Sequence, residues 1–116
     1  MSGLTTVDVL RGAKAVLERN GWTQDDYAAL GPGYDGSIPL AECPVCLRGA
    51  VNVAGGSPDP ARATEASDDA WRVLRRMVFR RYRTAPIGWN DEPVRTVAEV
   101  FALLDEAIVL AEGSAS

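Results

Sequence analysis

The segment 67–83, SDDAWRVLRRMVFRRYR, decides how this chain folds, because its apolar residues recur at helical spacing. Their positions predict a helix with one buried face, made of Trp71, Leu74, Val78 and Tyr82. Ser67 and the two aspartates that follow it are typical of a helix start, where side-chain oxygens and negative charge are favourable. We therefore expect a helix from Ser67 to Arg83.

Three further helices are predicted on either side of this segment. The first covers residues 6–19 and ends at Asn20-Gly21, since glycine readily adopts the left-handed conformation that closes a helix. A short helix over residues 44–53 begins with a proline, which suits a first turn. The last begins with the capping box Thr96-Val97-Ala98-Glu99. Helical spacing predicts that the core contains Leu10, Val16, Leu17, Trp71, Leu74, Val78, Phe101, Leu104 and Ile108.

The stretches between the helices are rich in turn-forming residues. Within residues 23–42, the segments 27–30 and 38–40 are interpreted as two short strands of a small β-hairpin. Loops are predicted at 55–60 and 84–93, and a frayed tail at 113–116. The predicted fold class is mainly α. Residues 1–116 are expected to form a single small domain of about four helices. If the short hairpin is present, the fold class is α+β.

Composition excludes several classes of protein. A chain of 116 residues can bury a core without disulfides or a metal. It has no apolar run of about 18 residues, so no membrane span is expected. Its first residues show neither a basic start nor an apolar run, so no signal peptide is expected either. These features predict a cytoplasmic protein.

The chain contains no histidine, and this absence narrows the chemistry most. It removes the commonest general base, the serine and cysteine dyads that depend on histidine, and every histidine-containing metal site. No phosphate-binding glycine loop is present, and the adjacent carboxylate pairs point in different directions if they lie on helices. We therefore expect no catalytic residues, no cofactor and no metal, and a protein that is not an enzyme.

The predicted helix 67–83 carries six arginines and no acidic residue between Trp71 and Arg83. Helical geometry places four of them in one sector of roughly 80°, with Phe79 beside it. One interpretation is a contact row for an acidic protein or a nucleic acid, made of Arg72, Arg76, Phe79, Arg80 and Arg83. The other is a solvated face that pairs with the chain's own 16 acidic residues.

The segment Trp89-Asn90-Asp91, with Arg95 after it, is a second candidate site. Asn90 and Asp91 can hydrogen-bond the local backbone, and Arg95 can pair with an acid, so a structural role in the loop is one interpretation. The other is a small binding surface formed by Trp89, Asn90, Asp91 and Arg95.

Cys43-Pro44-Val45-Cys46 is the third candidate. Two thiols at a helix start can act as a redox pair, because the amino end of a helix stabilises a thiolate. They can also supply half of a zinc site, although the chain has no second cysteine pair and no histidine, so a dimer would have to complete the four ligands. The remaining interpretation is that both are structural thiols, and the sequence alone does not separate these three or exclude a disulfide.

Three fragments together resemble a family of small uncharacterised proteins from actinobacteria and their phages. They are Asn20-Gly21-Trp22, Cys46-Leu47-Arg48-Gly49-Ala50, and Ile87-Gly88-Trp89-Asn90-Asp91 followed by Arg95-Thr96 and Glu99-Val100. In that family a helix precedes the tryptophan, and a Trp-Asn-Asp loop precedes the last helix. Arg48 departs from the apolar residue of the middle motif, and Cys43 is an extra cysteine. The resemblance implies a fold and a host, and no activity.

These observations lead to one main functional hypothesis and one alternative. The first is a small, non-enzymatic accessory protein, phage-encoded or actinobacterial, that binds a host protein or associates with itself as a homodimer. The alternative is a nucleic-acid-binding accessory protein that uses the arginine-rich helix, although the net charge of −4 argues against extensive nucleic-acid contact. No contact with a membrane is expected.

Overall fold

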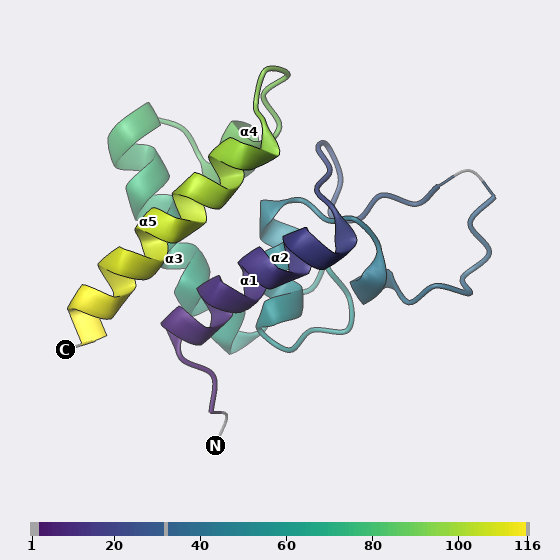
Figure 1. Ribbon diagram of the computed structural model, residues 1–116, viewed down its shortest axis with the longest axis horizontal. Coiled ribbons are helices and arrows are strands. Elements are labelled where there is room, and N and C mark those ends of the chain that lie inside the picture. The colour runs from purple at the N-terminus through teal and green to yellow at the C-terminus, as the bar shows by residue number, and fades with distance from the viewer. Residues whose placement is uncertain (1–2, 32, 116) are drawn as a thin grey trace.

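The structure is a computed structural model that describes residues 3–31 and 33–115. Five α-helices form most of it, so the predicted mainly α class is confirmed (Figure 1). They are α1 (Thr6–Asn20), α2 (Leu47–Ala54), α3 (Glu65–Tyr82), α4 (Pro86–Asn90) and α5 (Val97–Ala115), with a short 3₁₀ turn at Leu40–Glu42. In Figure 1, α1 and α5 lie side by side, with their amino ends at opposite ends of the pair.

Side chains near the helix starts explain where the helices begin. Thr5 and Asp8 form a capping box on α1, with backbone-to-side-chain distances of 3.0 and 3.1 Å. Thr64 caps α3, so the predicted start at Ser67 is wrong by two residues. The reason is that the Ser67 hydroxyl accepts a hydrogen bond from the Thr64 backbone N–H and acts in the first turn of the helix. The predicted capping box between Thr96 and Glu99 is confirmed on α5.

Helix α4 lies inside residues 84–93, which the sequence predicts to be a loop, so the helix count is five instead of four. A helix of five residues is too short to show a 3.6-residue repeat, and its one visible signal is Pro86 in the first turn. Helix α5 continues to Ala115, so residues 113–115 of the predicted frayed tail are helical, and Ser116 lies outside the described residues.

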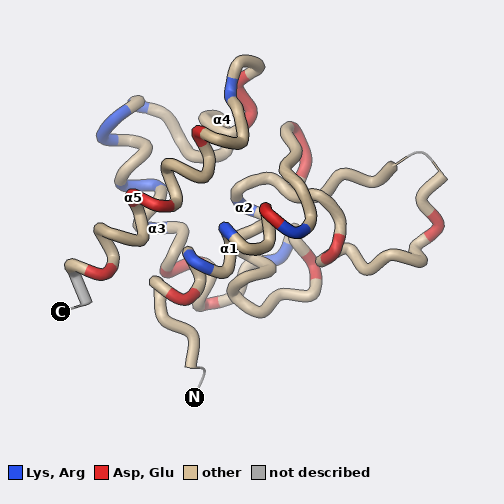
Figure 2. The backbone as a smooth tube through the Cα atoms, in the orientation of Figure 1, with Lys and Arg blue, Asp and Glu red and all other residues tan. Residues whose placement is uncertain are grey.

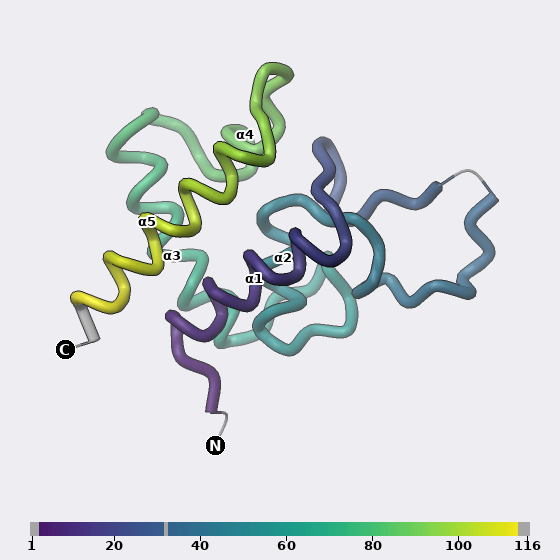
Figure 3. Tube along the Cα trace, viewed as in Figure 1, coloured from purple at the N-terminus to yellow at the C-terminus, as the bar shows by residue number. Residues whose placement is uncertain are grey.

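The predicted β-hairpin is absent from the described residues of segments 27–30 and 38–40, where no pairing joins the two segments. Instead, Trp22 and Ala28 each form an isolated bridge with Val45, just before α2. Val45 therefore holds both ends of the segment that follows α1. Among the residues that follow it, 29–31 and 33–39 form an open loop that extends away from the helices (Figure 3).

One hydrophobic core joins the helices. Seven of the nine predicted core residues are buried, and Phe101 and Ile108 are half-buried against the same cluster. Helix α2 approaches α1 closely: a side chain at Gly12 would place its Cβ 3.0 Å from that of Ala54. The core therefore fixes α1, α3 and α5 relative to one another, and these three helices position the candidate site.

Candidate docking groove

The arginine face predicted on α3 is exposed to solvent along its whole length. Figure 2 shows basic residues gathered toward the carboxyl end of α3. Arg72 forms an ion pair of 2.9 Å with Asp69, one turn earlier on the same helix. Arg83 lies just beyond the helix in the left-handed conformation, with its guanidinium 5.7 Å from the centre of the Phe79 ring. The predicted row is therefore divided, and Arg76 and Arg80 form its middle part.

Arg76 and Arg80 differ from Arg81 and Arg11, which have acidic partners on another helix. Arg81 pairs with Glu106 of α5 at 2.5 Å, and Arg11 of α1 pairs with Glu112 at 2.6 Å. Within the part of the chain that the structure describes, neither Arg76 nor Arg80 forms an ion pair. Arg75, their neighbour, also has none there, and its position on the helix is outside the groove described next.

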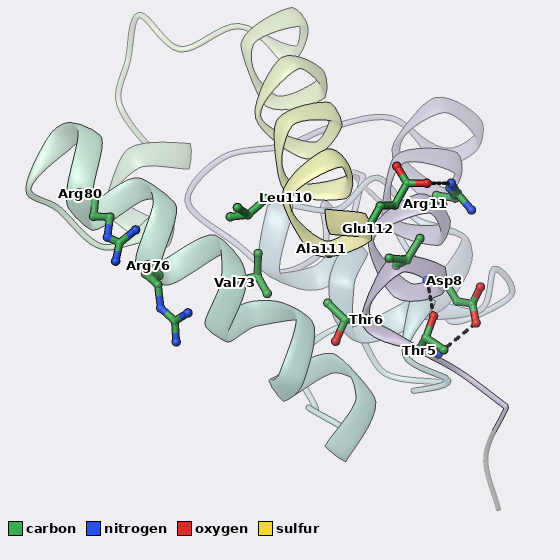
Figure 4. A pocket seen from close by; sticks show the side chains of 11 residues that line it. Thr5, Thr6, Asp8, Arg11, Val73, Arg76, Arg80, Leu110, Ala111 and Glu112 are labelled. Carbon is green, nitrogen blue, oxygen red and sulfur yellow. Dashed lines mark hydrogen bonds and ion pairs between the residues drawn. The ribbon is translucent and has the colours of Figure 1, made fainter. Parts of the chain in front are cut away.

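A groove of about 790 Å³ lies between α3, the start of α1 and the last turns of α5 (Figure 4). Arg76 and Arg80 extend from α3 on one side of it. Val73 of α3 and Leu110 of α5 face each other across the groove, and Val7 of α1 contributes a third apolar side chain. A surface that combines apolar side chains with unpaired cations is suited to binding, not to hydration alone.

The opposite rim of the groove carries negative groups that are already engaged. The backbone N–H of Thr5 donates to the Asp8 carboxylate and lowers the pKa of that group. The Glu112 carboxylate is held by Arg11. The groove therefore has a basic side with free hydrogen-bond donors and an opposite side where Glu112 is neutralised by Arg11 and Asp8 keeps its negative charge.

The segment around Asn90 differs from the groove because the Asn90 side chain is buried and makes its hydrogen bonds inside the protein. Its Oδ1 accepts hydrogen bonds from the Trp22 indole at 2.7 Å and from the Leu47 backbone at 3.1 Å. Its Nδ2 donates to Asp91 and to the carbonyl of Thr23. We call this group the Asn90 hub; it consists of Trp22, Thr23, Leu47, Asn90 and Asp91. It joins the segment after α1, the start of α2 and the end of α4.

Trp89 and Arg95 extend the same interior arrangement. Trp89 and Asn90 are each only 1% exposed, so the structure places both residues inside the protein. The Arg95 guanidinium lies 4.0 Å from the Trp89 ring centre, and its Nε donates to the Trp89 carbonyl. Arg95 also pairs with Glu92 and Glu99. This geometry corresponds to the structural interpretation of the Trp-Asn-Asp segment.

Residues 1–110 match the sequence model of DUF6197, a family of unknown function. The chain belongs to DUF6197. No curated protein and no solved structure matches it. The match covers α1 to α4 and most of α5, so it includes the Asn90 hub and the groove except for Ala111 and Glu112.

The two cysteines of this DUF6197 chain are buried and not joined to each other. The Cys46 sulfur accepts a hydrogen bond from the Gly49 backbone at 3.4 Å and caps α2. Burial raises the pKa of the Cys46 thiol, which disfavours the reactive thiolate. Among the described residues, no group of three or more histidine, cysteine or acidic side chains could hold a metal ion. None of the helices formed by those residues has the length and apolar character needed to cross a bilayer.

The apolar part of the groove in this DUF6197 chain is absent from the sequence predictions. Val7, Val73 and Leu110 come from three different helices, and only the packing of those helices brings them together. In the structure, each of them is half-buried or exposed. The one signal that the sequence offers is their position at the edge of the apolar stripe of each helix.

Proposed function

We propose that this DUF6197 protein is a non-enzymatic accessory protein that binds an anionic partner through Arg76 and Arg80. One observation carries the proposal: these two arginines extend beside an open groove and have no acidic partner among the described residues. Arginine suits such a role, because its planar guanidinium forms paired hydrogen bonds with carboxylate or phosphate.

A protein from the host is the partner that we favour, with self-association as a homodimer as a variant of the same idea. The resemblance to small proteins of actinobacteria and their phages supports a host partner. Two unpaired thiols support a cytoplasmic location, since that compartment keeps thiols reduced. The titratable groups that line the groove are Asp8, Glu112 and three arginines, and a set without a nucleophile and its base supports a non-enzymatic role.

Nucleic acid is the second candidate partner, and one observation favours it. Phe79 is 57% exposed beside the guanidinium of Arg83, an arrangement on which a base could stack. The net charge of −4 and the carboxylates on the far rim of the groove oppose it. A binding experiment with both classes of anion separates the two candidates.

The proposal is tested by titrating the protein with labelled poly-L-glutamate and with a short DNA duplex at several salt concentrations. The double variant Arg76→Glu/Arg80→Glu should lose binding, while its melting temperature stays unchanged. The control is Arg62→Glu/Arg75→Glu, which makes the same change of charge at two exposed arginines outside the groove. Equal binding by both double variants, or binding of neither anion by the wild type, would contradict the proposal.

A further inference from the structure

The structure points to a more specific occupant of the groove, and we infer that it is an amphipathic, acidic α-helix of a partner protein. This inference rests on the proposed function, because it uses the same two arginines. It adds the apolar residues of the groove, the spacing of the charges and the chemistry of the opposite rim.

The groove has two chemically different surfaces that run side by side. Val73 and Leu110 face each other across it, and Leu110 is 48% exposed although it lies on the core-forming helix α5. Arg76 and Arg80 form the adjoining wall. A ligand that satisfies both needs an apolar stripe next to a row of negative charges. An extended polyanion supplies only the second of these.

The spacing of the charges matches a helix. Arg76 and Arg80 are four residues apart on α3, which places them about 6 Å apart along the helix axis. Acidic residues at positions i and i+4 of a partner helix have the same rise. A helix laid alongside α3 therefore offers one carboxylate to each guanidinium. Helices recognised in apolar grooves present their anchors at this spacing.

The opposite rim disfavours a phosphate backbone. Asp8 and Glu112 lie there, and both carboxylates are exposed. A nucleic acid that contacts Arg76 and Arg80 would bring phosphates toward the Asp8 carboxylate, which no ion pair neutralises among the described residues, whereas the charge of Glu112 is balanced by Arg11. A helix with acidic residues on one side only can keep its neutral or basic side toward Asp8 and Glu112. Charge complementarity across the groove thus selects an asymmetric ligand.

The test uses three synthetic peptides of about 18 residues, roughly 27 Å of helix. The first has leucines along one stripe and glutamates at i and i+4 beside it. The second has the same composition with the stripe dispersed, and the third has glutamine in place of each glutamate. A short DNA duplex is the fourth probe. Binding of each to the full chain is measured by fluorescence anisotropy at one salt concentration.

Two pairs of neighbouring residues supply matched variants. Arg76→Glu changes a groove residue, and Arg75→Glu makes the same change just outside the groove. Leu110→Ser removes an apolar groove residue, and Val109→Ser removes one that is 69% exposed and outside it. We expect the first peptide to bind to the wild type with an affinity about tenfold higher than that of the other two peptides. Arg76→Glu and Leu110→Ser should each lower the affinity for the first peptide about tenfold and so remove this difference. The two control variants should bind like the wild type.

The outcomes separate this inference from the proposed function. If the striped and dispersed peptides bind equally and Arg76→Glu weakens both, anion docking stands and the helical partner is overturned. Preferential binding of DNA that depends on Arg76 likewise overturns the helical partner. A dimer of the wild type that Arg76→Glu dissociates, seen by sedimentation, identifies a second copy as occupant and also overturns it. Failure of all four probes, or binding that Arg76→Glu leaves unchanged, overturns both.

Discussion

The Asn90 hub and the groove wall of α3 use polar side chains in opposite ways. Every hydrogen-bonding atom of the Asn90 side chain has a partner inside the protein. Arg76 and Arg80 extend into solvent and form no ion pair among the described residues. A buried polar group must be satisfied or the fold loses stability, whereas an exposed cation carries no such obligation. The hub therefore serves the fold, and the wall remains available for a partner.

The comparison is sharpest between two arginines. The Arg95 side chain is 8% exposed, stacks on Trp89 and pairs with two glutamates. Arg76 has the same chemical group without any of these contacts in the described structure. Residue type alone thus says little about whether an arginine is structural; burial and partners decide it.

The largest effect is expected at the centre of the hub. Asn90→Leu keeps much of the volume but leaves the Trp22 indole N–H and the Leu47 backbone N–H without an acceptor. We expect a loss of about 3 kcal/mol or more in the free energy of unfolding, measured in urea. Asn20→Leu is the control, because Asn20 is half-buried and its side chain makes two hydrogen bonds, to the Ala41 carbonyl and from the Arg19 side chain, against four at Asn90. Equal losses in the two variants would show that the hub is not special.

A second prediction concerns the close packing next to the hub. A Cβ at Gly49 would lie 2.5 Å from the Tyr27 carbonyl oxygen and 3.1 Å from the Val45 Cβ. Gly49→Ala should therefore cost about 1–3 kcal/mol, although alanine is the better helix former. At Gly88 of α4 the nearest atom to a new Cβ is 3.4 Å away, so Gly88→Ala should be neutral or stabilising. Thermal melts of both variants check the pair, and a stable Gly49→Ala protein would contradict the packing described.

The two arginines can be compared directly. Arg95→Met removes the stacking on Trp89, the hydrogen bond to its carbonyl and both ion pairs, and should cost about 1.5 kcal/mol. Arg76→Met should change the stability by less than about 0.5 kcal/mol, since it removes an exposed side chain. Urea denaturation measures both. Similar losses would mean that Arg76 has a structural role, and the proposed function would lose its main support.

The smallest expected effect has the opposite sign. Arg76 and Arg80 are like charges at i and i+4, so Arg80→Gln should stabilise the protein by about 0.3 kcal/mol at low salt and by less at high salt. Arg81→Gln is its neighbouring control; it removes the ion pair with Glu106 and should be slightly destabilising. A destabilising Arg80→Gln would show that this arginine contributes to the fold.

The helices could be predicted from the sequence because their signals are local. Apolar spacing located α1, α3 and α5, and the Thr96–Glu99 capping box located the start of α5 correctly. The predicted hairpin failed for a non-local reason: the backbone of residues 21–29 pairs with residues 44–46, beyond the turn that the sequence suggested. Turn-forming residues show that a loop is present, but they do not show which distant part of the chain pairs with its backbone.

In the candidate site, too, the local features could be predicted from the sequence and the non-local contacts could not. The angular position of each arginine on α3 follows from helical geometry, and exposure of the row was predicted correctly. Which arginines remain unpaired depends on where α5 places Glu106 and Glu112, and the sequence does not show that. Likewise, Trp89 and Asn90 could be singled out from the sequence, but only the packed structure shows that Trp22 and Leu47 are their neighbours.

The Asn90 hub also has a consequence for the order of folding. Its hydrogen bonds join Asn90 to Leu47 and Trp22, which are 43 and 68 positions away along the chain. Closing such long loops costs chain entropy, so these bonds form after the local turns of α1 and α3. We expect the hub to be largely unformed in the folding transition state. Its loss would then speed up unfolding and leave the folding rate nearly unchanged, which makes Asn90 a determinant of the lifetime of the native state.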